Sequence, residues 1–97
     1  MKPITYHPKA NEEIDEAYSW YAKQSVRAAD GFFEEYFAAI KKVGGQPKGS
    51  SPFLHGTERI ILDRYPFSII FRELPHKIQV VAVAHAKRRP GYWAKRL

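Results

Sequence analysis

The chain has 97 residues, 44% of them hydrophobic and 14% aromatic, which suits one domain with a single buried core; it contains no cysteine, which excludes disulfide bonds and thiolate metal sites. Its net charge of +6 is unevenly placed, because residues 1–43 carry six Lys/Arg and seven Asp/Glu, whereas residues 44–97 carry ten and three. The basic second half indicates an acidic partner, nucleic acid or an acidic protein segment, or else a solvated face that keeps the protein soluble.

The N-terminal segment Met1–Lys9 lacks the apolar core of a signal peptide, and no apolar run approaches the length of a membrane span. We therefore expect a cytoplasmic protein with no membrane partner. Ile4–His7 has the composition of a short strand that ends at Pro8. Proline suits the first turn of a helix, because the amide that it lacks would have no partner there.

Two apolar stripes at three- and four-residue spacing predict two helices. The first stripe contains Ala10, Ile14, Ala17, Tyr18 and Tyr21. The second follows Ser25, a predicted N-cap, and contains Phe33, Tyr36, Phe37, Ile40 and Val43, with Phe32 and Ala29 alongside. Gly44, Gly45 and Pro47 are predicted to end it. The link between the helices is short, which predicts an antiparallel hairpin.

Beyond the hairpin, Gln46–Glu58 is rich in Gly, Pro and Ser and predicts an irregular loop. The hydrophobic period then changes to two, which predicts three strands at Arg59–Arg64, Phe67–Glu73 and Ile78–Ala84. The resulting β-α-α-β-β-β order predicts an α+β fold, a helical hairpin packed on one face of a largely antiparallel four-stranded sheet. We expect a single domain over residues 1–97.

Strict alternation along the strands assigns one apolar set to the helix-facing side of the sheet. That set is Ile60, Leu62, Phe67, Ile69, Phe71, Ile78, Val80, Ala82 and Ala84. The same alternation assigns Val83 and His85 to the opposite side.

A two-residue turn at Tyr65-Pro66 would place Arg59 opposite Arg72 on neighbouring strands. Like charges directly opposed weaken a sheet, unless a phosphate or a carboxylate lies between them. Alternatively both arginines extend into water, or one pairs with Glu58 or Glu73.

The C-terminal segment His85–Leu97, called the tail below, holds five basic residues and no acid. Its charges attract phosphates and its aromatic rings can stack on bases, and the same side chains can hold an acidic peptide. The predicted target-binding residues are Arg59, Arg72, Lys87, Arg88, Arg89, Tyr92 and Trp93. For Tyr92 and Trp93, the alternative is a structural lid over the sheet.

His85 ends a core strand, where it could act as a general acid or base or as a structural hydrogen-bonding residue. His7, His55 and His76 show no metal-ligand spacing, and the sequence has no Gly-rich phosphate loop and no nucleophile elbow. We therefore expect no metal and no cofactor. The carboxylates of the first helix, Glu12, Glu13 and Glu16, are interpreted as a solvated face.

Several segments, in this order and spacing, resemble the ParE branch of the RelE/ParE toxins. They are His7-Pro8-Lys9-Ala10, Glu12-Glu13-Ile14, Trp20-Tyr21, Phe32-Phe33-Glu34, Tyr65-Pro66-Phe67-Ser68-Ile69 and residues 83–93. The resemblance covers nearly the whole chain and implies the toxin half of a type II toxin–antitoxin module, of the plasmid-stabilisation kind. It also implies a cognate antitoxin whose C-terminal segment wraps the toxin and neutralises it, as a hetero-oligomer.

The resemblance leaves two activities open. ParE-like members inhibit DNA gyrase, whereas RelE-like members cut mRNA in the ribosome with basic strand residues and an aromatic–basic tail. Ile61 and Ser68 stand where the nucleases carry basic residues, so that only His85, Arg88 and Tyr92 could supply the chemistry of RNA cleavage.

We therefore expect a non-enzymatic, ParE-like toxin that binds gyrase. The alternatives are a RelE-like ribosome-dependent mRNA endonuclease and a barely toxic binding module. The antitoxin is expected in the groove between the hairpin and the sheet, where an amphipathic helix would contact Tyr18, Tyr21 and Tyr36, although these tyrosines could instead face the core.

Overall fold

The computed structural model of the protein describes residues 2–43 and 50–97. Its helices and strands in chain order are β1 (Ile4–Tyr6), α1 (Pro8–Gln24), α2 (Val26–Val43), β2 (Ser50–Pro52), β3 (Glu58–Ile61), β4 (Phe67–Glu73) and β5 (Ile78–His85). Two short 3₁₀ turns lie at Leu54–Gly56 and Ala94–Arg96.

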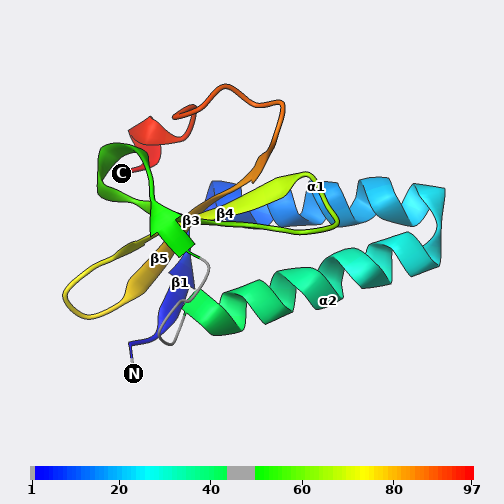
Figure 1. Ribbon diagram of the computed structural model, residues 1–97, viewed down its shortest axis with the longest axis horizontal. Helices are drawn as coiled ribbons and strands as arrows, with labels where there is room; N and C mark the ends of the chain where they lie inside the picture. The colour runs from blue at the N-terminus through cyan, green and yellow to red at the C-terminus, as the bar shows by residue number, and fades with distance from the viewer. Residues whose placement is uncertain (1, 44–49) are drawn as a thin grey trace.

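The helical hairpin forms as the sequence predicts, with α1 and α2 side by side and their connection extending past the sheet (Figure 1). The side chain of His7 caps the N-terminus of α1. Ser25 begins α2 as its predicted N-cap, because its Oγ accepts a hydrogen bond from the amide of Ala28 at 2.9 Å. The predicted end of α2 at Gly44, Gly45 and Pro47 lies outside the described residues.

The predicted α+β architecture is confirmed, with both helices on one face of a sheet whose strand order is β1-β5-β4-β3-β2. β1 runs parallel to β5, and the other neighbours are antiparallel. The sheet has five strands and not the predicted four, because Ser50–Pro52, within the predicted loop, pairs with β3. Pro52 is tolerated there because an edge strand needs no outward-facing amide.

The predicted register between β3 and β4 is wrong by two residues. Arg59 lies opposite Ile70, and Arg72 lies opposite Gln79 of β5, so the two arginines do not face each other. The connection is longer than two residues, because the amide of Leu62 already pairs with the carbonyl of Phe67 at 2.9 Å. A shift of two residues keeps each side chain on its face, so the assignment of β3 to its two faces stands.

A β-bulge in β5 changes the face that its second half presents. Phe71 pairs with Val80 and Ile70 with Ala82, which leaves Val81 as the extra residue. Beyond the bulge, Val83 packs in the helix-side core, whereas Ala82 packs on the other face. The predicted assignment of Ala82, Ala84, Val83 and His85 is therefore wrong, because strict alternation does not survive an inserted residue.

Each face of the sheet has its own apolar core. The helix-side core is built around Phe32, which is fully buried and packs against the rings of Tyr21, Tyr65 and Phe67 at 5.4–5.6 Å between ring centres. The tail-side core consists of Ile70, Val81, Ala82 and Trp93, with Phe53, Ala84 and Tyr92 packed against it. The tail thus covers the sheet face that the helices leave open.

Candidate functional site

The carboxylate of Glu13, on α1, fastens the tail to the body of the protein. It accepts hydrogen bonds from the hydroxyl of Tyr92 at 2.6 Å and from both terminal nitrogens of Arg96 at 2.9 and 3.0 Å. It also accepts from the amide of Val83 at 3.0 Å, and Arg96 donates to the carbonyl of Val81 at 3.0 Å. These residues join α1, β5 and the tail, and we call them the tail clasp.

The tail clasp is shielded from water, because the side chains of Arg96 and Glu13 are only 11% and 13% exposed. Burial by itself raises the pKa of Glu13, but the hydrogen bonds from Arg96, Tyr92 and Val83 outweigh it and hold the pKa below its ordinary value. Burial, together with the bond to Glu13, raises the pKa of the Tyr92 hydroxyl well above its ordinary value. At neutral pH the clasp therefore holds a carboxylate, a neutral phenol and a guanidinium.

The interpretation of Glu13 as part of a solvated face is wrong, although its neighbours Glu12 and Glu16 are exposed. β1 ends at Tyr6, opposite Val80 of β5, so the amide of Val83 has no β1 carbonyl to pair with. A buried amide needs an acceptor, and Glu13 supplies it.

The three residues considered for catalysis lie together at the start of the tail. The Nδ1 of His85 accepts from the amide of Lys87 at 3.0 Å, and its ring meets the ring of Phe67 edge-on at 5.0 Å. The guanidinium of Arg88 lies 3.8 Å from the centre of the Tyr92 ring. His85, Arg88 and Tyr92 all line a groove on the helix side of the sheet and a smaller hollow on its other side.

The groove lies between α1 and the start of the tail and encloses about 440 Å³. It is lined by Glu13, Glu16, Ala17, Trp20, Tyr21, Pro66, Phe67, Val83, His85, Lys87, Arg88 and Tyr92. Its floor is largely apolar and aromatic, and Lys87 and Arg88 make its exposed basic rim. The arrangement is suited to an amphipathic segment that also carries acidic groups.

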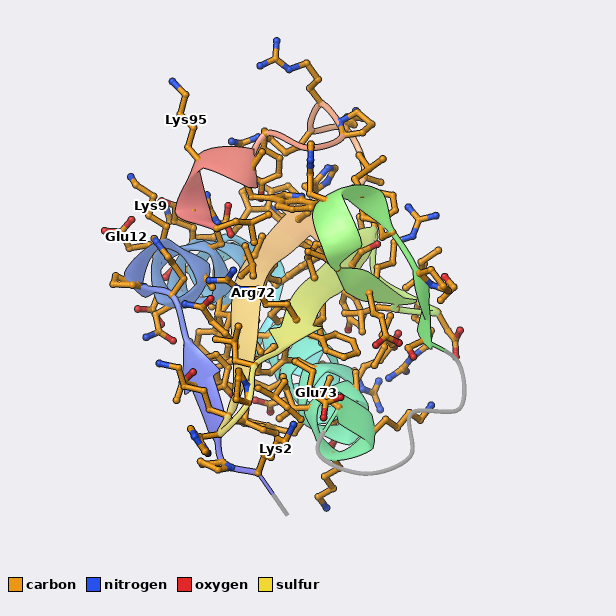
Figure 2. The ribbon with its side chains drawn as sticks, turned by 90° about the vertical axis from the view of Figure 1, so that its left-hand side faces the viewer. Lys2, Lys9, Glu12, Arg72, Glu73 and Lys95 are labelled. Atoms are coloured by element: carbon orange, nitrogen blue, oxygen red, sulfur yellow. The ribbon has the colours of Figure 1, made fainter. Side chains whose placement is uncertain are left out.

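The hollow lies on the opposite face of the sheet, encloses about 90 Å³, and contains Arg59 and Arg89 among its lining residues. Arg72, labelled in Figure 2 and also predicted to bind the target, lines neither space. Its Nε donates to the Gln79 side chain at 2.9 Å. Trp93 is only 1% exposed and is a core residue. The prediction of Trp93 as a binding residue is therefore corrected: its ring covers the apolar sheet face, which agrees with the lid alternative.

The structure separates the three tyrosines predicted to bind the antitoxin. Tyr36 is 3% exposed and belongs to the helix-side core, so it is not available to a partner. Tyr18 is half-buried and stacks on Phe33 with 4.3 Å between ring centres. Tyr21 lines the groove beside Trp20, a residue that sequence reasoning missed and that is 58% exposed. The sequence feature that could have identified Trp20 is an aromatic residue in α1 that lies outside the apolar stripe of the helix.

Within residues 2–43 and 50–97, no group of three or more His, Cys, Asp or Glu side chains is placed to hold a metal ion. In the same part of the chain, no helix is both long and apolar enough to cross a membrane.

Comparison with known proteins adds two findings. Residues 4–90 match the family model described as "ParE toxin of type II toxin-antitoxin system, parDE". The fold is similar to a solved structure described as "Chromosomal ParDE TA system from P. aeruginosa", with a TM-score of 0.68, 23% sequence identity, and coverage of 90% of this chain and 98% of the other. No curated protein matches the sequence.

Proposed function

Since this chain belongs to the ParE toxin family of type II toxin–antitoxin systems, we propose that it arrests growth by binding DNA gyrase in the cytoplasm, and that a cognate antitoxin neutralises it. The observation that carries the proposal, beside the family, is the division of the tail into two kinds of residue. Tyr92, Trp93 and Arg96 are used to hold the tail in place, whereas Lys87 and Arg89 are exposed. Lys87 and Arg89 thus give the fastened tail an exposed basic surface.

The tail geometry favours binding over RNA cleavage. A general base must be able to take up a proton at neutral pH, and Tyr92 already donates its proton to Glu13, with its pKa raised by burial and by that bond. Arg88 lies over the ring of Tyr92. His85 is then the one remaining proton-transfer candidate of the three, and cleavage also needs a second proton-transfer group.

Gyrase binding is tested with a charge-reversed tail, Lys87→Glu/Arg89→Glu. We expect the unaltered protein to trap cleaved DNA with purified gyrase and to induce the DNA-damage response in cells. The tail variant should lose at least about 90% of the trapped complex, because like-charge contacts at an interface cost several kcal/mol. The matched control Lys41→Glu/Lys42→Glu changes the charge equally on exposed positions of α2 and should behave as the parent.

The alternative activity, mRNA cleavage in the ribosome, would give a different result. A toxin that stops translation, produces new mRNA ends and leaves DNA intact is a ribosome-dependent nuclease, and the gyrase proposal is then wrong. In that case Tyr92→Phe tests whether the hydroxyl acts in the chemistry or only in the tail clasp.

The antitoxin is proposed to place an apolar segment in the groove, against Trp20 and Tyr21. Trp20 is more than half exposed although aromatic, and it lines the same groove as the basic residues Lys87 and Arg88. Trp20→Ala should weaken the complex with the product of the adjacent open reading frame by about tenfold or more, since a buried interface tryptophan commonly contributes 2 kcal/mol or more. Phe37→Ala is the matched control, because Phe37 is 53% exposed but lies outside the groove lining.

A further inference from the structure

Arg59, on β3, has an unsatisfied polar group on the sheet face that the tail covers. Its Nε is buried and has no hydrogen-bond partner among the described residues. The guanidinium carbon lies 4.1 Å from the centre of the Phe53 ring, a cation–π contact. Buried polar groups are nearly always paired, so an orphaned arginine nitrogen indicates a missing acceptor.

The hollow beside Arg59 offers an acceptor a place next to the side chain of Arg59. It is lined from the sheet by Arg59 and Ser68 and from the tail by Arg88 and Arg89. None of the described residues that line it is acidic. Three other arginines in the described chain have side-chain acceptors: Arg64 pairs with Glu35, Arg72 with Gln79 and Arg96 with Glu13. The hollow therefore concentrates positive charge without an internal counter-ion.

We propose that this hollow binds a phosphate group. A guanidinium donates to oxyanions through a planar fork, and the Ser68 hydroxyl is a further donor on the lining. A space of about 90 Å³ admits the phosphate itself and leaves any sugar or base that carries it outside, on the exposed tail. The phosphate can be free or nucleic-acid-borne, and its binding is independent of which cellular target the toxin inhibits.

The alternative explanation is that Arg59 only stacks on Phe53 and needs no ligand. Calorimetric titration of inorganic phosphate into the full chain, at ionic strength held constant with chloride, separates the two. We expect saturable binding that Arg59→Met weakens at least about tenfold, because a hydrogen-bonded charged group commonly contributes 1.5–3 kcal/mol. Arg72→Met removes the same charge from the same sheet face and should change the affinity by less than about twofold, since Arg72 does not line the hollow.

Arg89→Met keeps the test decisive if Arg59→Met does not fold, because Arg89 is exposed and its loss should not affect folding. It should also weaken phosphate binding. The proposal is overturned if phosphate does not saturate, or if Arg72→Met weakens binding as much as Arg59→Met.

The source of the phosphate is found by repeating the titration with a short single-stranded oligonucleotide, with and without a 5′-phosphate. Tighter binding of either oligonucleotide than of inorganic phosphate, lost in Arg59→Met, assigns the hollow to a nucleic acid. Equal or weaker binding assigns it to free phosphate or a small phosphorylated molecule. If both ligands fail to bind, the Phe53 stacking explanation holds.

Discussion

The two faces of the sheet are closed in different ways. On the helix side, rings from α1, α2 and β4 pack around Phe32 and form a continuous apolar core. On the other side, a smaller core around Trp93 is held by a segment with little regular structure, fastened by the tail clasp. The first closure depends on hydrophobic periodicity, and the second depends on a few polar contacts between distant parts of the chain. We therefore expect that a single substitution in the tail clasp or at Trp93 can release the tail from its face of the sheet.

Removal of the largest ring from each core should give the largest effects and distinguish the two faces. Phe32→Ala and Trp93→Ala should each destabilise the protein by about 3–5 kcal/mol, the usual result for a buried aromatic residue. We expect Phe32→Ala to unfold the chain as a whole and Trp93→Ala to release mainly the tail. Hydrogen exchange of α1 and α2 measures the difference, and equal loss of protection in the two variants would show that the faces fold as one unit.

Glu13→Ala should have the next largest effect, about 3 kcal/mol, because it removes the only charge partner of Arg96 among the described residues and the acceptor of the Tyr92 hydroxyl. Glu12→Ala is the matched control on an exposed position of the same helix and should change stability by less than about 0.5 kcal/mol. Urea unfolding measures both. A small effect of Glu13→Ala would mean that the apolar contacts of Trp93 alone hold the tail.

Gly31→Ala tests the helix-side face and should cost about 1–3 kcal/mol, the usual range for overpacking. A Cβ at Gly31 would lie 2.4 Å from the hydroxyl oxygen of Tyr65, which donates to the carbonyl of Ala28. Tyr65→Phe removes that oxygen, so the double variant should be more stable than the sum of the two single effects predicts. Strict additivity would contradict the proposed clash.

The contrast between the two faces also explains which structural features could be predicted from the sequence alone. The helices and the long strands follow from apolar stripes, and the face assignment of β3 follows from period two. The bulge at Val81 was hidden because Val80-Val81-Ala82-Val83-Ala84 is apolar throughout, so that the pattern does not show where the alternation breaks. Strict alternation therefore assigns His85 to the wrong side of the sheet, away from Phe67.

Long-range polar contacts were equally hidden. Glu13 has the same local sequence character as Glu12 and Glu16, and only the end of β1 and the path of the tail select it. The basic, aromatic character of the tail was evident from composition, but its division into buried and exposed residues was not. Trp93 is buried against the sheet face that the helices leave open, whereas Lys87 lies at the rim of the groove. The two residues therefore differ in role.

The smallest expected effect is a pH dependence that arises in the tail clasp. The pKa of Glu13 is lower in the folded protein than its ordinary value, because hydrogen bonds from Arg96, Tyr92 and Val83 outweigh its burial. The stabilisation is therefore fully present above the ordinary glutamate pKa of about 4.3 and is lost as the pH falls through the folded value. Tail protection from hydrogen exchange should decline over that acid range, before the protection of α2 does.

Glu13→Gln should remove this tail-specific decline, since an amide does not titrate there. Glu35→Gln is the informative control, because the pKa of Glu35 is also lowered, chiefly by hydrogen bonds from Arg64 against its own burial, but Glu35 lies on α2 and contacts the β3–β4 connection. Its replacement should alter the acid stability of the helix side and leave the tail titration unchanged. If Glu35→Gln removed the tail titration as well, the two faces would be electrostatically coupled, and the tail could not open independently.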